Sequence, residues 1–249
     1  LLYMVKVYLQ TPDLFAWTIV IVALSVLFEL LFLALTDALA GLLRRSPGGR
    51  AAQPESGVPP AVIRAEGLSK SYGGRTVLKD LGFTAGPGIT CVMAPSGAGK
   101  TTLLRLLTGL EPPEGGVITP APAQCRWAAV FQEDRLLEDL TAAGNLRFAL
   151  GAALDGSAAA LLADLGLDLE DPRPVRLWSG GMRRRLALAR ALLAPSGALA
   201  LDEPFTGLDG ALRARCMALI RQAAERKPVL LVTHDPADAQ GLPLVRLDG

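Results

Sequence analysis

The longest run of apolar residues lies near the start of the chain. Over residues 14–35, 19 of 22 residues are apolar, and the exceptions are Thr18, Ser25 and Glu29. A helix of that length extends about 33 Å, which matches a hydrocarbon core of roughly 30 Å. On the membrane-insertion scale, one acidic residue adds about 3 kcal/mol to the free energy of insertion. The Leu, Ile, Val and Phe residues together contribute roughly −6 kcal/mol. The pattern therefore predicts a transmembrane helix over 14–35, within a membrane segment over 1–45.

Charged residues beside this segment predict its orientation. Arg44, Arg45 and Arg50 follow it, whereas Lys6 is the only basic residue before it, so we expect the C-terminal side in the cytoplasm. The predicted location is the inner (plasma) membrane, with the rest of the chain on the cytoplasmic side. The alternatives are a buried core helix and a secretory signal peptide cleaved near residues 38–40. The apolar run is too long for a signal peptide, and the residues before it are not basic.

A stretch rich in proline and glycine follows the membrane segment. Residues 46–60 contain four prolines and three glycines and show no apolar period. Such a composition is typical of a linker. We therefore expect a separate domain to begin at residue 61.

From residue 61 onward, short apolar runs alternate with helical patterns. Runs at 89–93, 198–201 and 229–232 have the length of buried strands, and residues 101–109 have a helical pattern. Buried strands that alternate with helices are typical of a mainly parallel sheet covered on both faces. Residues 135–195 are almost wholly helical in pattern. The prediction is an α/β domain over 61–249 with an inserted helical subdomain over about 135–195.

Composition excludes several classes of function. The chain has 25 basic and 24 acidic residues, a net charge of +1, so there is no basic field to hold a nucleic acid. The three cysteines, Cys91, Cys125 and Cys216, are odd in number and far apart, which disfavours disulfides and a cysteine-based zinc site. His234 is the only histidine, which excludes a multi-histidine metal centre.

The strongest chemical motif follows the predicted strand at 89–93. The sequence APSGAGKTT begins at Ala94 and leads into the predicted helix. Glycines here let backbone N–H groups surround a phosphate, a lysine adds positive charge for the β- and γ-phosphates, and a threonine hydroxyl can ligate Mg²⁺. The general P-loop pattern calls for glycine at the position that Ala94 occupies in this chain. Ala94 is harmless there only if its φ is negative. The residues expected to contact a nucleotide are Ser96, Gly97, Ala98, Gly99, Lys100, Thr101 and Thr102.

A second motif precedes a long helical pattern. Ser179-Gly180-Gly181 stands before an amphipathic run over 182–193. Serine is a good helix N-cap, and two glycines leave the N–H groups of the helix start open to an anion. The alternative is an ordinary capped helix whose arginines at 183–185 form a solvated face.

Single polar residues follow other apolar runs. Asp202 and Glu203 follow one predicted strand, His234 follows another, and Gln132 follows a short apolar run. A carboxylate at the end of a buried strand can hold Mg²⁺, and the next carboxylate can polarise an attacking water. Each signal is weak alone, and a single histidine after a strand is more often structural.

Together these motifs resemble the ATP-binding cassette (ABC) ATPases, and the resemblance covers essentially residues 61–249. Order and spacing are similar to the Walker A, Q-loop, signature, Walker B and H-loop motifs of that family. Lys100 precedes Gln132 by 32 residues, Gln132 precedes Ser179 by 47, Ser179 precedes Asp202 by 23, and Glu203 precedes His234 by 31.

The resemblance implies a role for each residue. Tyr72 would stack on adenine, Gln132 would sense the metal and the attacking water, Glu203 would be the general base and His234 would contact the γ-phosphate. The cofactors implied are ATP and Mg²⁺, the metal being held by Thr101, Gln132 and Asp202. In a head-to-tail dimer, the ATP bound by one chain would be capped by Ser179, Gly180 and Gly181 of the other, and Asp209 would communicate between subunits.

This sequence departs from the family pattern at a few positions, none of which removes a catalytic group. Ala94 replaces glycine, and Thr206-Gly207 replaces Ser-Ala in the segment before Asp209. Trp178 and Met182 replace the usual Leu and Gln of the signature.

Two further resemblances concern transport. The sequence around Gln132 resembles importers of nitrate, sulfonates, taurine and thiamine-precursor pyrimidines, and residues 7–45 resemble the last helix of their permease. The implied function is the ATP-hydrolysing subunit of a small-solute importer. Its partners would be a second ATPase subunit (a homodimer or a paired chain), a membrane permease and an external solute-binding protein, with no nucleic acid. The alternatives are a non-transport ABC ATPase acting on DNA or ribosomes, and a nucleotide-dependent interaction subunit without efficient turnover.

Overall fold

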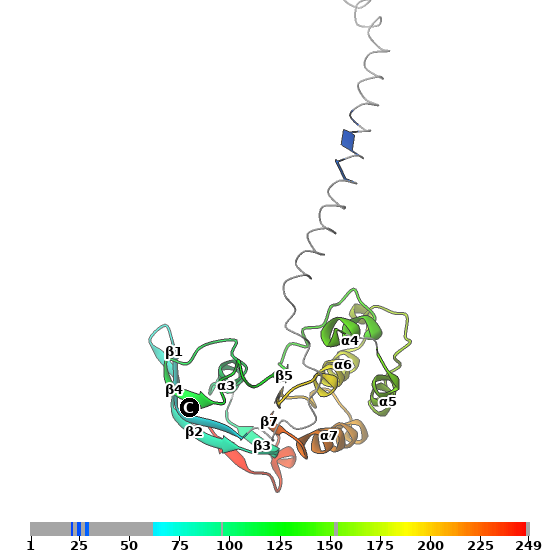
Figure 1. Cartoon of the computed structure of the whole chain (residues 1–249). Coiled ribbons are helices and arrows are strands. Elements are labelled where there is room, and N and C mark those ends of the chain that lie inside the picture. The colour runs from blue at the N-terminus through cyan, green and yellow to red at the C-terminus, as the bar shows by residue number, and fades with distance from the viewer. Residues whose placement is uncertain are drawn as a thin grey trace, which may run out of the picture. The chain divides into compact units, whose positions relative to one another are not determined.

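The computed structural model of the chain describes residues 62–247 apart from Ser96, Ala152 and Ala153, and in addition Ile21, Leu24, Ser25, Phe28 and Glu29. The chain divides into two compact units, Leu1–Glu55 and Ser56–Gly249. The elements of the second unit (Figure 1) are β1 (Ile63–Tyr72), β2 (Arg75–Ala85), β3 (Gly88–Met93), α3 (Lys100–Leu107), β4 (Gly115–Thr119), β5 (Trp127–Val130), α4 (Ala142–Leu150), α5 (Gly156–Asp164), the 3₁₀ turn η1 (Val175–Leu177), α6 (Gly180–Leu193), β6 (Ala198–Asp202), α7 (Gly210–Ala224), β7 (Pro228–Val232), α8 (Pro236–Ala239) and β8 (Leu244–Arg246).

In the first unit, the five described residues are helical and exposed. Three of them are large apolar side chains, Ile21, Leu24 and Phe28, with exposed fractions between 58% and 71%. Within the part of the chain that the structure describes, no helix is long and apolar enough to cross a membrane. Apart from those five positions, the predicted span over 14–35, the rest of the membrane segment and the linker over 46–60 lie outside the described residues.

A five-stranded parallel sheet forms the centre of the second unit. Its strand order is β5-β6-β7-β3-β8, and every neighbouring pair is parallel. Because these strands are parallel, their carboxyl ends meet at one edge of the sheet, the place where α/β proteins bind ligands. The predicted parallel sheet is confirmed: the bounds of β3, β6 and β7 lie within one residue of the predicted apolar runs, whereas β8 was not predicted.

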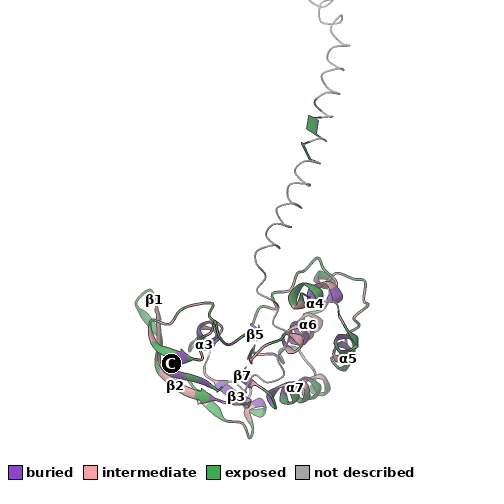
Figure 2. Ribbon diagram, in the orientation of Figure 1, coloured by how far each residue is buried: buried purple, intermediate pink, exposed green. Residues whose placement is uncertain are grey.

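The central strands β3, β6 and β7 are buried on both faces, which explains why they are apolar without alternation. On β6, Leu199 and Leu201 belong to one hydrophobic core, whereas Ala198 and Ala200 belong to the other. All four side chains are fully buried. Figure 2 shows the same pattern of buried central strands between more exposed helices.

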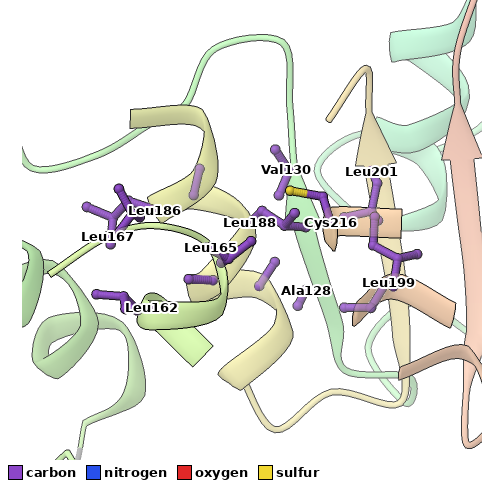
Figure 3. Packing of buried hydrophobic residues seen from close by; sticks show 14 of the residues in the cluster. Ala128, Val130, Leu162, Leu165, Leu167, Leu186, Leu188, Leu199, Leu201 and Cys216 are labelled. Carbon is purple, nitrogen blue, oxygen red and sulfur yellow. The ribbon is translucent and has the colours of Figure 1, made fainter. Parts of the chain in front are cut away.

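Helix α6 supplies the centre of the first core. Figure 3 shows Leu188 next to the sheet residues Val130 and Leu201, and Leu186 toward the loop residue Leu167. The described residues between β5 and β6 contain α4, α5, η1 and α6 and no strand. Helix α3 contributes to the second core, so α3 and α6 pack on opposite faces of the parallel sheet.

A three-stranded antiparallel sheet of order β2-β1-β4 was not predicted from the sequence. Strand β1 pairs with β2 through a two-residue turn at Gly73-Gly74, and both glycines have positive φ, 57° and 82°. That combination is the tight hairpin turn favoured by the twist of paired strands. The turn brings Tyr72, at the end of β1, opposite Arg75.

Candidate nucleotide-binding site

The loop between β3 and α3 has the backbone that the glycine motif predicts. Gly97 and Gly99 have φ values of 80° and 90°. A Cβ added at Gly99 would lie 2.9 Å from side-chain carbons of Val77 and Leu78 and 3.0 Å from the Val77 carbonyl oxygen. Glycine is therefore required at 99 for both conformation and space. The predicted contact residue Ser96 lies outside the described residues.

Lys100 is the first residue of α3 and closes this loop. Its Nζ donates hydrogen bonds to the carbonyl oxygens of Ala94, at 2.7 Å, and Pro95, at 3.1 Å. Asp80, Arg135 and Glu203 are the described non-glycine residues with positive φ, so Ala94 adopts an ordinary conformation and its lost glycine costs no strain. The ammonium group is thus positioned at the loop by weak neutral acceptors, which an anionic phosphate can replace.

Thr101 and Asp202 meet although they are far apart in sequence. The Thr101 hydroxyl donates to a carboxylate oxygen of Asp202 at 3.1 Å. Asp202 ends strand β6 and is 3% exposed, and this burial raises the pKa of its carboxyl, while the bond from Thr101 opposes the shift. A hydroxyl and a carboxylate are oxygen donors of the kind Mg²⁺ prefers beside phosphates. Among the described residues, no group of three or more His, Cys, Asp or Glu side chains is placed to hold a metal ion.

Glu203 and His234 form the next pair along the sheet edge. Nδ1 of His234 lies 2.9 Å from a carboxylate oxygen of Glu203. The backbone of Glu203 has a φ of 47°, and its N–H donates to the Val232 carbonyl on the neighbouring strand at 2.9 Å. Residues other than glycine rarely adopt this left-handed backbone conformation, and such strained positions cluster at functional sites. The carboxylate remains 25% exposed, so solvent can reach it.

Gln132 follows β5 and is exposed. Its carbonyl oxygen accepts a hydrogen bond from Nη1 of Arg184 at 3.3 Å. Arg184 is 5% exposed, so the interpretation of 183–185 as a solvated face is wrong at this position. No signal in the sequence distinguishes Arg184 from its two neighbouring arginines, because all three interrupt the apolar pattern equally.

Tyr72 lies close to the helix that begins at Lys100. Its hydroxyl donates a short hydrogen bond to Glu111, and Glu111 also pairs with Arg105 of α3 at 3.1 Å. The bond to Glu111 raises the pKa of Tyr72, and its interaction with Thr102 opposes that shift. Tyr72 is 43% exposed, which leaves area for a flat ligand to stack on its ring. No pattern in the sequence indicates that Glu111 contacts Tyr72 and Arg105.

The Ser179 motif has the predicted helix start. The Ser179 hydroxyl accepts a hydrogen bond from the Met182 N–H at 3.2 Å, which confirms the N-cap. Gly180 is exposed, and a Cβ there would meet nothing within 4 Å. A Cβ at Gly181 would lie 3.3 Å from the Gly207 carbonyl oxygen, so this motif lies beside the segment before Asp209. Asp209 itself caps α7 by accepting from the Leu212 N–H at 2.9 Å.

These positions fall into two groups. Lys100, Thr101, Asp202, Glu203 and His234 gather at the carboxyl edge of the parallel sheet, whereas Ser179 heads a helix on the face opposite α3. Figure 1 likewise shows α3 and α6 on opposite sides of β5.

Comparisons with known proteins identify the family of this chain. Residues 78–206 match the family model described as ABC transporter. The aliphatic sulfonates import ATP-binding protein SsuB 2 of Burkholderia cenocepacia (strain HI2424) is 38% identical over 197 residues, which cover 75% of this chain and 73% of that protein. SsuB 1 of Rhizobium johnstonii is 41% identical over 194 residues, covering 72% and 70%. The Fe(3+) ions import ATP-binding protein FbpC of Streptomyces coelicolor is 38% identical over 202 residues, covering 74% and 58%.

Solved structures give the same result. The dimeric structure of MJ0796, a bacterial ABC transporter cassette, superposes with a TM-score of 0.67 at 25% identity and covers 74% of this chain and 94% of that one. A post-hydrolysis form of the same cassette, bound to ADP and phosphate, superposes with a TM-score of 0.66 at 25% identity, covering 75% and 94%. By sequence match, fold and the arrangement of its motifs, the chain belongs to the ABC transporter family, through the ATP-binding domain of that family.

Proposed function

We propose that the chain is the ATP-binding and ATP-hydrolysing subunit of an importer for a small solute. The observation that carries this proposal is the continuous set of contacts at the sheet edge. Thr101 bonds Asp202, the next residue is Glu203, and Glu203 bonds His234. Lys100 lies beside them at the start of α3, where it is held only by two carbonyl oxygens.

The geometry supports a distinct task for each side chain. Lys100 exchanges its loop carbonyls for phosphate oxygens when ATP enters the loop. Thr101, Asp202 and Gln132 are the residues that would hold Mg²⁺, which when bound would neutralise charge on the phosphates. Glu203 accepts the proton of the attacking water. His234 orients the Glu203 carboxylate through their 2.9 Å contact and would contact the γ-phosphate of a bound ATP.

Two chains complete each site in this proposal. The open helix start at Ser179-Gly180-Gly181 lies on the face opposite α3, so it caps the ATP of a partner chain and not its own. The relative MJ0796 is dimeric in its solved structure. Asp209 follows the segment packed against Gly181. We assign it the role of communicating between the ATP sites of the two subunits.

The partners follow from the same proposal. The named relatives include import proteins for aliphatic sulfonates and for Fe(3+) ions. We assign this chain to the group that takes up nitrate, sulfonates, taurine or thiamine precursors, with a permease and an external solute-binding protein as partners. The ATPase domain over 61–249 lies on the cytoplasmic side of the membrane, and residues 14–35 form the transmembrane helix that tethers it. Co-purification of the full chain from its native membrane, followed by titration of the co-purified binding protein with each solute, tests the assignment.

The substitution Glu203→Gln tests the catalytic core of the proposal. We expect it to retain ATP binding but to slow hydrolysis by at least ~10²-fold, equivalent to about 3 kcal/mol in the barrier. The matched control Glu225→Gln, at an exposed position after α7, should hydrolyse ATP at the wild-type rate. Near-normal turnover by Glu203→Gln would show that Glu203 is not the base, and no turnover by the wild-type chain would favour the interaction-subunit alternative.

A further inference from the structure

Arg184 is a buried cation whose guanidinium lies between two segments of the candidate site. It belongs to α6, near the helix start at Ser179, and it is 5% exposed. Burying a charge is unfavourable unless hydrogen-bond partners replace the lost water. The structure supplies such partners from both segments, and they are mainly backbone oxygens.

One side of the guanidinium holds the end of β6. Nη2 donates to the Glu203 carbonyl oxygen at 2.9 Å, Nε donates to the same oxygen at 3.3 Å, and Nη2 makes a further short bond to the Asp202 carbonyl. Glu203 is the residue with a φ of 47°. Its carbonyl is thus fixed by Arg184, while its N–H is fixed by Val232.

The other side of the guanidinium holds the segment after β5. Nη1 makes a short bond to the Phe131 carbonyl and donates to the Gln132 carbonyl at 3.3 Å. It also pairs with the Asp134 carboxylate at 3.0 Å, and that carboxylate is 23% exposed. Strands β5 and β6 are parallel neighbours in register, so one side chain spans the ends of both.

We propose that Arg184 is a positioning residue that holds the backbone of Glu203 in its left-handed conformation. That conformation directs the Glu203 carboxylate to His234. Because Arg184 belongs to α6 and also bonds the Gln132 segment, it couples the conformation of Glu203 to both. The expected effect of Arg184 on ATP hydrolysis rests on the proposed function. The structural part of the inference concerns only the contact between Glu203 and His234.

Arginine is the residue type that can do this. Its planar guanidinium presents five N–H donors in a fixed fork, whereas lysine has a single ammonium group that cannot span two separated segments. A residue that served only to pair with Asp134 would need no bonds to Asp202 or Glu203. Since left-handed conformations persist only where the surroundings enforce them, losing the guanidinium should release Glu203.

The single histidine gives a direct measure of that release. Because His234 is the only histidine in the chain, the imidazole resonances of the full chain, labelled with ¹³C-histidine, come from one residue. We compare wild type, Arg184→Lys, Arg184→Gln and Glu203→Gln without nucleotide. The matched control is Arg185→Gln, because Arg185 is a neighbour on α6 that also donates to backbone carbonyls, those of Gly181 and Leu165 at 3.0 and 2.8 Å.

We expect both Arg184 variants to shift the His234 resonances toward their positions in Glu203→Gln, and Arg185→Gln to leave them at the wild-type positions. In steady-state assays Arg184→Lys should lower kcat at least ~10-fold with an unchanged KM for ATP. In a Glu203→Gln background it should add no further loss, because both changes act through one group.

Wild-type His234 resonances in the folded Arg184→Lys variant would overturn the inference, whatever its ATPase rate. If neither Arg184 variant folds, as judged by thermal unfolding, Arg184 is a core residue and the inference also fails. The resonance measurement needs no turnover, so it decides the inference even if the wild-type chain hydrolyses no ATP, which would instead contradict the proposed function.

Discussion

Asp202 shows at the scale of one residue how burial and function oppose each other. The carboxylate lies at the buried end of β6 and receives a hydrogen bond from Thr101. Its pKa is nevertheless raised, because desolvation outweighs that bond. The ionised carboxylate is therefore less favourable in the folded chain than in the unfolded one, and stability falls as the pH rises through the raised pKa.

This opposition gives a prediction for Asp202→Asn. Without nucleotide at neutral pH, the variant should unfold at the wild-type temperature or above, because a buried charge is removed while an amide oxygen can still accept from Thr101. Addition of Mg²⁺ and ATP should stabilise the wild type but not the variant. Thermal unfolding with and without Mg²⁺–ATP measures both effects. A variant that is less stable than wild type without ligand, yet fully stabilised by Mg²⁺–ATP, would contradict the assignment of Asp202.

Wild-type Mg²⁺ affinity should also depend on pH. A raised pKa means that Asp202 takes up a proton at a higher pH than an ordinary aspartate does. Since Mg²⁺ requires the carboxylate, affinity for Mg²⁺–ATP should fall on acidification earlier than it would at a solvated aspartate. Titrations of Mg²⁺ at fixed ATP across a pH series measure this, and a constant affinity down to the ordinary aspartate range would exclude Asp202 as a ligand.

At the residue scale, the sequence predicts which positions gather but not how they are held. Lys100, Asp202 and Glu203 could be identified because glycine turns and strand ends leave a local pattern. The buried bonds of Arg184 and the left-handed backbone of Glu203 could not, because both depend on contacts between segments far apart in the chain.

At the scale of elements, the parallel sheet could be predicted and the antiparallel sheet could not. The central strands β3, β6 and β7 are buried on both faces and appear as short apolar runs. Strand β1, in contrast, pairs with β2 with irregularities in register after Ala65 and Leu68, and its buried residues fall at 63, 65 and 68. Such bulges break the two-residue period by which a half-buried strand is recognised.

Packing of helix α6 against the sheet contributes to the free energy of unfolding. Leu188 is fully buried among residues of the parallel sheet and the surrounding helices. Leu188→Ala should therefore lower the free energy of unfolding by about 2–5 kcal/mol. Urea denaturation measures the loss. The control Leu110→Ala, at a side chain that is 55% exposed, should change stability by no more than about 0.5 kcal/mol, and equal effects at the two sites would contradict the packing described for α6.

At the scale of the whole molecule, every nucleotide motif follows residue 60, the end of the predicted linker. Deletion of residues 1–60 should therefore leave a protein that stays in the supernatant and binds ATP with wild-type affinity, whereas the full chain should sediment with membranes. Fractionation and nucleotide titration measure the two properties. Loss of ATP binding in the deletion variant would mean that the domain boundary is misplaced, and a full chain that stays in the supernatant would contradict the transmembrane helix.

The central claim for the whole molecule is that each ATP site is divided between two chains. Lys100 begins α3, and Ser179 caps α6 on the opposite face of the sheet. We therefore propose that one chain supplies the phosphate loop and the other the cap. Lys100→Ala and Ser179→Arg each damage both sites of a homodimer. A mixed dimer of the two variants combines both lesions in one site and leaves the other site intact.

The most direct test is to mix the Lys100→Ala chain with the Ser179→Arg chain and measure trapped ATP and ATPase activity. We predict that each variant homodimer alone neither traps nor hydrolyses ATP. Mixing the two variants should restore ATP trapping at the dimer interface or partial hydrolysis. Full turnover is not required, because the two sites can depend on each other. If mixed dimers form but restore neither trapping nor hydrolysis, the motifs work within one chain and the divided-site account is contradicted.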